Sequence, residues 1–137
     1  MTGPAKTKIA VAVREDLAAW QKLNMTAFLV SGIAARFDTV GVDYADANGV
    51  RYLPMFGQPV LVYAADVDQL RTVHQRATAR ELDCAVYTDE LFTTGNDVAN
   101  RAAVRAVPTD ELKLAGLAVY GSRNAVDKTF KGLRLHP

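Results

Sequence analysis

The chain has 137 residues, half of them apolar and 23% charged, with a formal net charge of +1. This length suits one domain over residues 1–137 with a single sizeable core, and we expect residues 1–6 to be flexible. The near-neutral charge argues against a strongly basic nucleic-acid-binding surface, and the apolar runs are too short to span a bilayer. A single cysteine, Cys84, excludes an internal disulfide, so we expect a soluble cytoplasmic protein.

The first half of the chain predicts two buried strands around a long helix. Residues 8–13 (KIAVAV) form a nearly continuous apolar run, which is typical of a strand covered on both faces. Asp16 is suited to cap a helix over residues 17–36, which contain no proline. A turn-rich stretch with a turn at residues 46–49 then leads to a second buried strand at 59–65.

The second half continues the alternation of helices and strands. Asp66 and Gln69 have the capping-box spacing that opens a helix. The remaining pattern predicts a strand at 83–88 with Cys84 buried in it, a short helix capped by Asn96 or Asp97, a strand at 112–121, a turn or short helix at 124–131, and a last short strand at 133–135.

Strands separated by helices predict an α/β fold: a layered mixed or parallel sheet of about four strands with helices on both faces. Ligand sites in such sheets tend to lie beyond the carboxyl ends of the strands. Here those ends are the polar segments RED, AADVD, TDELFTTGND and GSRN, where we expect a site.

Polar residues at these ends are candidates for a site, and each has a structural alternative. Lys22 and Thr26 share one helix face. Lys22 either reaches water near the helix start or points into a cleft, where it would bind an anion or stabilise an oxyanion. Asp89, followed by Thr93 and Thr94, either orients a water molecule or belongs to an ordinary polar turn.

A second polar group surrounds the start of the short helix and consists of Asn96, Asp97, Asn100 and Arg101. A helix N-terminus favours anions, although these residues also suit a cap and a solvated face. Trp20 and Asn24 form another pair four residues apart in the long helix. The chain has no CxxC, HExxH, GxGxxG or GxxxxGK[ST] pattern, so we expect neither a metal nor a cofactor.

Several segments, taken in order, resemble the type 2 peptidyl-tRNA hydrolases: a strand ending in VREDL, a lysine early in the first helix, GQPV, TDELFTT and VDKTFKGLRL. The segments VREDLAAWQKLN, AVYTDELFTTGND, NR and VDK…GL.LHP more closely resemble a bacterial family of that superfamily, the domain of unknown function two thousand.

The hydrolases cut the ester between a peptide and tRNA, and the resemblance implies Lys22, Asp89 and Thr93 as the catalytic residues. This chain departs from their pattern. Thr26 stands where they carry glutamine, the same helix lacks their histidine, and the GNDVANRAAVRAV segment replaces a shorter loop. The fold therefore carries over better than the activity.

Three functions follow from these observations. An enzyme would use Asp89 to activate water, Thr93 to position it and Lys22 to stabilise the oxyanion of an aminoacyl, peptidyl or small acyl ester. Binding of tRNA is possible but not favoured. A non-catalytic module would bind a small anion or nucleotide, and an interaction protein would form the homodimer that we expect. The predicted ligand-binding residues are Arg14, Trp20, Asn24, Thr26, Thr94, Asn96, Asp97, Asn100 and Arg101.

Overall fold

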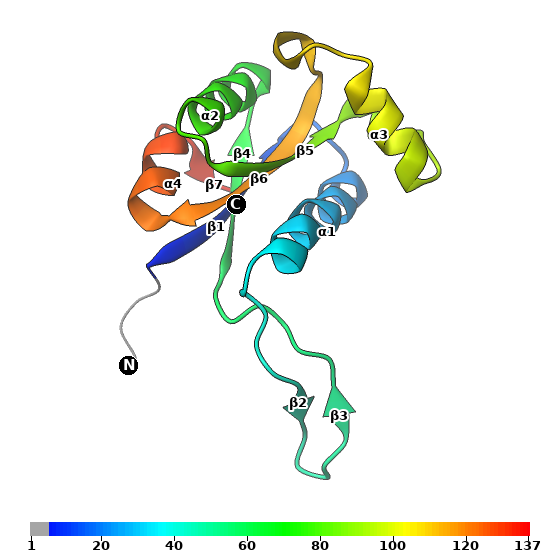
Figure 1. Cartoon of the computed structure of the whole chain (residues 1–137), viewed down its shortest axis with the longest axis vertical. Helices are drawn as coiled ribbons and strands as arrows, with labels where there is room; N and C mark the ends of the chain where they lie inside the picture. Colours follow the sequence, from blue (N-terminus) through cyan, green and yellow to red (C-terminus); the bar gives the residue numbers. More distant parts are fainter. Residues whose placement is uncertain (1–5) are drawn as a thin grey trace.

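A computed structural model describes residues 6–137 and has an α/β architecture (Figure 1). The flexibility expected for residues 1–6 falls mainly on residues 1–5, which lie outside the described residues. The strands are β1 (Thr7–Arg14), β2 (Tyr44–Ala45), β3 (Arg51–Tyr52), β4 (Val60–Ala65), β5 (Asp83–Thr88), β6 (Leu114–Ser122) and β7 (Arg134–Leu135). The helices are α1 (Ala19–Arg36), α2 (Val67–Ala79), α3 (Asp97–Arg105) and α4 (Arg123–Thr129), with short 3-10 helices η1 (Asp89–Phe92) and η2 (Thr109–Glu111).

Within the described residues, five strands form one mixed sheet in the order β5-β6-β1-β4-β7. β1 and β4 are parallel, whereas β6 is antiparallel to both of its neighbours and β7 is antiparallel to β4. The prediction of an α/β fold with a mixed sheet is therefore confirmed. The fifth member is the two-residue strand β7, which corresponds to the last short strand expected from the sequence.

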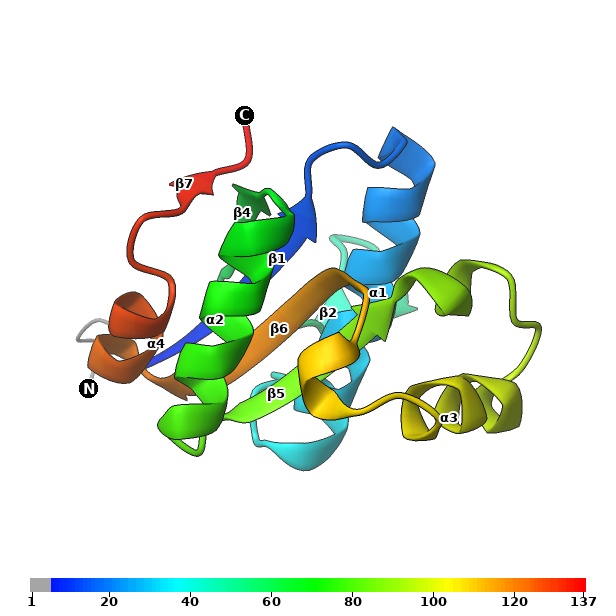
Figure 2. The same cartoon turned by 90° about the horizontal axis from the view of Figure 1, so that it is seen from above.

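Helices cover both faces of the sheet and create two separate cores, because successive side chains of a strand point to opposite faces. Figure 2 shows α1 on one side and α2 and α4 on the other. The core under α1 contains Ile9, Val11, Val13, Met25, Leu29 and Ile33. The core under α2 and α4 contains Ala10, Ala12, Leu70, Val73, Ala77, Val126 and Phe130. Each large aliphatic side chain buried in this way stabilises the fold by about 1.5–3 kcal/mol.

The close approach of α1 to the sheet depends on Gly116 in β6. A Cβ atom at this position would lie 2.8 Å from the Met25 side chain and 2.8 Å from the Ala12 carbonyl oxygen. Both distances are far below van der Waals contact. Any larger residue therefore requires the end of the Met25 side chain and the Ala12 backbone to shift.

One edge of the sheet gathers the carboxyl ends of β1, β4 and β5, since these three strands run in the same direction. The GSRN segment at the end of β6 lies at the opposite edge, where Ser122 pairs with Thr7. The expectation that all four strand ends meet at one edge is wrong for GSRN, because β6 runs against its neighbours.

α1 begins differently from the prediction. Ala18, not Asp16, is the N-cap residue, and the Ala18 N–H donates to the side-chain oxygen of Gln21 at 3.0 Å. Asp16 is held by Arg14 instead, at 2.7 Å. Asp16 is therefore unavailable as a cap, although its residue type favours that role.

The other two predicted helix starts are found. Asp66 and Gln69 form the reciprocal capping box, with bonds of 2.8 and 2.9 Å. Of the two candidates for α3, Asn96 is the cap, and its side-chain oxygen accepts the Ala99 N–H at 2.8 Å. The start of α3 is thereby fixed beside the carboxyl edge of the sheet.

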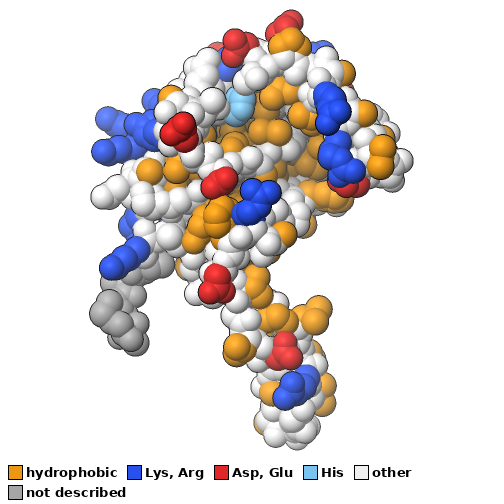
Figure 3. All heavy atoms as spheres, viewed as in Figure 1, with side chains coloured by type: hydrophobic (Ala, Val, Ile, Leu, Met, Phe, Trp, Pro, Cys, Tyr) orange, Lys and Arg blue, Asp and Glu red, His pale blue; other side chains and the backbone are white. Residues whose placement is uncertain are grey.

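Residues 38–57 form an arm that projects from the body between α1 and β4 (Figure 1). The short strands β2 and β3 pair along it, and the expected turn at 46–49 closes its tip, where the Gly49 N–H donates to Asp46 at 3.0 Å. Apolar side chains lie along the arm (Figure 3). The exposed ones are Val42, Tyr44, Val50, Tyr52, Leu53 and Met55.

Three further expectations concern single features of residues 6–137. None of the helices in this part of the chain has the length and apolarity needed to cross a membrane. No cluster of three or more His, Cys, Asp or Glu side chains within it is suited to hold a metal ion. We expected Cys84 to be buried, but it is exposed. The reason is that β5 is an outer strand of the sheet.

Candidate functional site

The three residues that the hydrolase resemblance implies do not share a cavity. The Lys22 ammonium lies 3.1 Å from Nε2 of His136, and Asp89 is paired with Arg14 at 2.8 Å. Lys22 and Asp89 line different cavities. Thr93 is exposed, and its hydroxyl donates to the Glu90 carbonyl oxygen at 2.9 Å.

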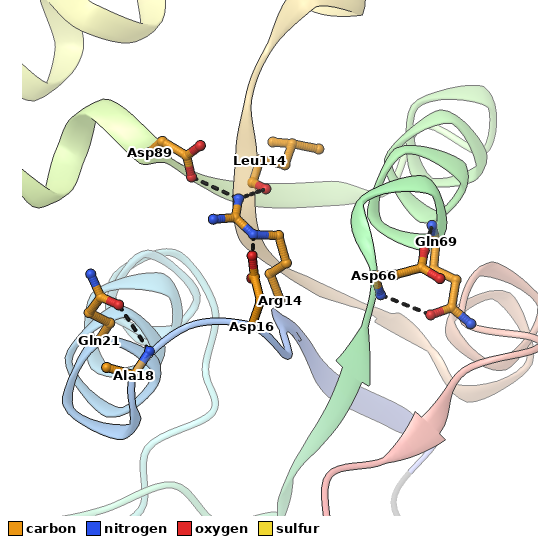
Figure 4. A network of polar contacts seen from close by, with 8 residues as sticks. All are labelled: Arg14, Asp16, Ala18, Gln21, Asp66, Gln69, Asp89 and Leu114. Atoms are coloured by element: carbon orange, nitrogen blue, oxygen red, sulfur yellow. Dashed lines mark hydrogen bonds and ion pairs between the residues drawn. The ribbon is translucent and has the colours of Figure 1, made fainter.

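Arg14 links the ends of three strands (Figure 4). Its Nε donates to Asp16 at 2.7 Å, and its Nη1 donates to Asp89 at 2.8 Å and to the Leu114 carbonyl oxygen at 3.0 Å. Burial lowers the pKa of Arg14, but the hydrogen bonds to the two carboxylates outweigh it and leave the pKa above its usual value. Arg14, a predicted ligand residue, thus already has three protein partners.

Six of the predicted residues line one cavity of about 240 Å³ between the start of α1 and the η1–α3 connection. These are Trp20, Asn24, Thr94, Asn96, Asp97 and Asn100. We call this cavity the amide pocket. These residues fall in two short segments of the chain, and each segment forms one wall of the pocket.

Aromatic rings that the sequence reasoning missed form the rest of the amide pocket. The Phe92 ring lies edge-on to Trp20, with centroids 6.2 Å apart, and 4.8 Å from the Tyr87 ring. Phe28 lies 6.1 Å from Tyr87 on the other side. Trp20 and Phe28 remain 62% and 55% exposed. Phe28 follows Trp20 and Asn24 at helical spacing, which is the signal that could have identified it.

The amides of the pocket leave hydrogen-bond donors available. The Thr94 hydroxyl donates to Oδ1 of Asn100, and Oδ1 of Asn96 accepts the Ala99 N–H. The Nδ2 groups of Asn96 and Asn100 have no hydrogen-bond partner among residues 6–137. They can therefore donate to an acceptor atom of a bound molecule.

Tyr87 stays protonated at the floor of the pocket. Burial raises the pKa of Tyr87, and a hydrogen bond with Asn24 lowers it only in part. The hydroxyl group lies 3.3 Å from the Leu91 carbonyl oxygen, to which it donates. Tyr87 is thus a neutral wall residue near pH 7.

A larger hollow of about 540 Å³ adjoins the amide pocket, and we call it the arginine hollow. It shares Phe28, Tyr87, Leu91, Asp97 and Asn100 with the amide pocket, and Arg101 and Arg105 of α3 complete one wall. Arg101 is paired with Asp97 one helical turn away. The lining contains two arginines and one aspartate, so the hollow carries a net positive charge.

Lys22 and Thr26 lie on the side of α1 opposite to Trp20 and Asn24. Each of them is two positions from a residue of that pair, and two positions along a helix correspond to a rotation of about 200°. Together with His136 they line a cavity of about 630 Å³. The Thr26 hydroxyl donates to the Lys22 carbonyl oxygen at 2.7 Å. His136 lies 114 positions from Lys22, and nothing in the sequence pattern predicted that the two meet.

The chain matches the family model described as Protein of unknown function (DUF2000) over residues 7–137. The chain belongs to the DUF2000 family. No curated protein matches it. The chain is similar to the solved structure of Atu0240, a protein of unknown function from Agrobacterium tumefaciens strain C58. It is 44% identical, with a TM-score of 0.95, and the match covers 98% of this chain and 100% of that one. The predicted membership of the DUF2000 family is thereby confirmed, and the matched residues include those that line all the cavities described above.

Proposed function

We propose that this DUF2000 protein binds a small molecule in which a flat, hydrogen-bonding ring is joined to one anionic group, as in a nucleoside monophosphate. The observation that carries the proposal is the continuity of the amide pocket with the arginine hollow, which have five wall residues in common. A ring-binding part and an anion-binding part therefore adjoin within one groove.

The amide pocket suits a nucleobase or a similar ring. Trp20 and Phe28 expose aromatic faces beside it, and stacking of a base on an aromatic side chain contributes about 1–3 kcal/mol. The free amide donors of Asn96 and Asn100 match the ring nitrogens and carbonyl oxygens at a base edge. Apolar walls with a few placed polar groups are typical of small-molecule sites.

The arginine hollow suits a single phosphate better than a chain of phosphates. Arg101 and Arg105 supply two positive charges, and Asp97 offsets one of them. Guanidinium groups bind phosphate through two parallel hydrogen bonds. Arg101 is 65% exposed, so we expect the electrostatic contribution to weaken with added salt.

Thermal-shift and calorimetric titration with AMP, GMP, CMP and UMP tests the proposal, with adenosine, inorganic phosphate and ATP as comparisons. At least one monophosphate should stabilise the protein more than its nucleoside or phosphate alone. Asn100→Ala should abolish the thermal shift. Arg105→Gln should weaken binding of the monophosphate but not binding of the nucleoside. Asn124→Ala, at an exposed asparagine of α4, is the matched control. Binding that survives Asn100→Ala would contradict the proposal.

An ester hydrolase of the peptidyl-tRNA hydrolase type is less well supported. It would require Lys22, Asp89 and Thr93 to meet at one reacting bond, whereas Lys22 contacts His136 and Asp89 contacts Arg14. Incubation with aminoacyl and peptidyl esters, followed by chromatography, separates the two functions. A nucleotide recovered intact together with no ester cleavage supports binding. Ester cleavage lost in both Lys22→Ala and Asp89→Asn would support the hydrolase.

The arm supports a second function, self-association into a homodimer. Six exposed apolar side chains lie on it, and monomeric proteins rarely expose apolar patches above a few hundred Å². A two-stranded ribbon is also marginally stable alone. A second copy offers the same apolar surface across a two-fold axis.

Light scattering with size-exclusion chromatography tests this second function. The unmodified protein should be a dimer, and Leu53→Asp in the arm should yield monomers. Val98→Asp, at an apolar residue of α3 that is 70% exposed, is the control and should leave the mass unchanged. A monomeric unmodified protein would refute the arm as a dimer interface.

A further inference from the structure

The cavity beside Lys22 has the chemistry of a second binding site. Its volume is about 630 Å³, and its walls are Val13, Ala19, Leu23, Thr26, Ala27 and Val62, with Lys22 and His136. Volumes of this order are typical of small-molecule sites. Most of the lining is aliphatic, and the charged group is confined to one place.

The contact between Lys22 and His136 indicates which group donates and which accepts. Nζ of Lys22 lies 3.1 Å from Nε2 of His136, and an ammonium group can only donate hydrogen bonds. Nε2 therefore accepts, and the proton of the neutral imidazole lies on Nδ1, which donates to the Pro137 carbonyl oxygen at 2.9 Å. Two further N–H groups of the Lys22 ammonium remain for a ligand.

The fold holds His136 in place through strand pairing. β7 pairs with β4 in the register Tyr63–Leu135 and Ala64–Arg134, and the His136 N–H donates to the Val62 carbonyl oxygen at 2.9 Å. The histidine is thus positioned by the pairing of β7 with β4 and not by a free tail. Its ring faces α1 at Lys22.

No carboxylate of residues 6–137 lies within 4.0 Å of the Lys22 ammonium. The lysine therefore lacks an anionic partner among the described residues, although a partly buried ammonium group favours one. Leu23, which lines the same cavity, is 73% exposed. An anion joined to an apolar chain would satisfy both features at once.

We infer that this cavity binds an amphiphilic carboxylate, such as a medium-chain fatty acid. The carboxylate accepts hydrogen bonds from the Lys22 ammonium beside His136, and the aliphatic chain lies against Leu23, Ala27 and Val62. Charge complementarity selects an acid over an alcohol, and the apolar walls select a chain over acetate. This site is independent of the amide pocket, because the two lie on opposite sides of α1.

Calorimetric titration with octanoate tests the inference, with octanol and acetate as the uncharged and short-chain comparisons. Octanoate should bind more tightly than either. Lys22→Met keeps the aliphatic stem and removes the charge. It should lower the affinity for octanoate at least about tenfold. Lys22→Arg should retain binding, and Lys128→Met, at an exposed lysine of α4, should leave it unchanged.

A measurement on the unmodified protein keeps the test independent of how the variants fold. Isotope-filtered NMR should show contacts between octanoate methylenes and the methyl groups of Leu23 and Val62. Absent binding, equal binding of octanol and octanoate, or unchanged binding to Lys22→Met would overturn the inference. Lys22→Met should still respond to the nucleoside monophosphates, so failure of either site is recognised separately.

Discussion

The ion pair between Arg14 and Asp89 determines whether Asp89 is free for chemistry, and its strength is measurable. Arg14→Gln removes hydrogen bonds to Asp16, Asp89 and Leu114. The Arg14 side chain is 14% exposed, against 69% for Asp16 and 43% for Asp89. We assign about 0.5 kcal/mol to the exposed Asp16 pair and about 1 kcal/mol to the Asp89 pair. The carbonyl left without its donor adds about 1 kcal/mol.

We therefore expect Arg14→Gln to lower the free energy of unfolding by about 2–3 kcal/mol, and Asp89→Asn by about 1 kcal/mol. The double variant should lose less than the sum of the two, because the pair can be lost only once. The measurement is urea unfolding with linear extrapolation. Arg71→Gln is the control, since that arginine borders the same cavity but is 55% exposed and 3.9 Å from its partner Asp68.

Two results would refute this reasoning. An Arg14→Gln variant within about 0.5 kcal/mol of the unmodified protein would mean that the guanidinium bonds contribute nothing in solution. Strictly additive losses in the double variant would mean that Arg14 and Asp89 do not interact. In either case the pairing with Arg14 would no longer count against Asp89 as a base, although Lys22 and Asp89 would still line different cavities.

Three further outcomes follow from the structure. Gly116→Ala should destabilise the protein by about 1–3 kcal/mol because of the contact with Met25, and unchanged urea unfolding would contradict that packing. The pKa of Tyr87 is raised on folding. The contribution of Tyr87 to the free energy of unfolding is therefore fully present below its unfolded pKa of about 10, and it is lost as the pH rises through the folded pKa. Tyr87→Phe should reduce this alkaline loss of stability, and an identical alkaline profile would argue against a raised pKa. Nitrogen-15 NMR should show His136 as the Nδ1–H tautomer, and a proton on Nε2 would exclude the bond from Lys22.

The sequence predicted those parts of the fold that depend on neighbouring residues. Continuous apolar runs identified β1 and β4, and the Asp66–Gln69 spacing identified the start of α2, because both signals are local. The direction of β6 is set by its pairing partners, so its carboxyl end was assigned to the wrong edge. Asp16 has the residue type of a cap, but its carboxylate is paired with Arg14, two residues earlier in the chain.

The candidate site shows the same division. Six wall residues of the amide pocket could be named from the sequence because they cluster in two segments with helical or loop spacing. The aromatic residue Phe92 was overlooked, since one apolar residue in a loop has no periodicity to indicate its role. The partnership of Lys22 with His136 joins the first helix to the last strand, and only the register of β7 on β4 creates it.

The base of the arm has a consequence for protein engineering. Its two legs are joined by backbone hydrogen bonds from Gly57 to Thr39 and from Gly41 to Met55, of 2.8 and 2.9 Å. Chain entering and leaving the body therefore passes through one narrow point, far from the carboxyl edge of the sheet. A short turn can replace the arm at small entropic cost, since closing a loop depends only weakly on its length. The same junction is a natural insertion point for a reporter or affinity peptide, which would turn the DUF2000 body into a compact display scaffold.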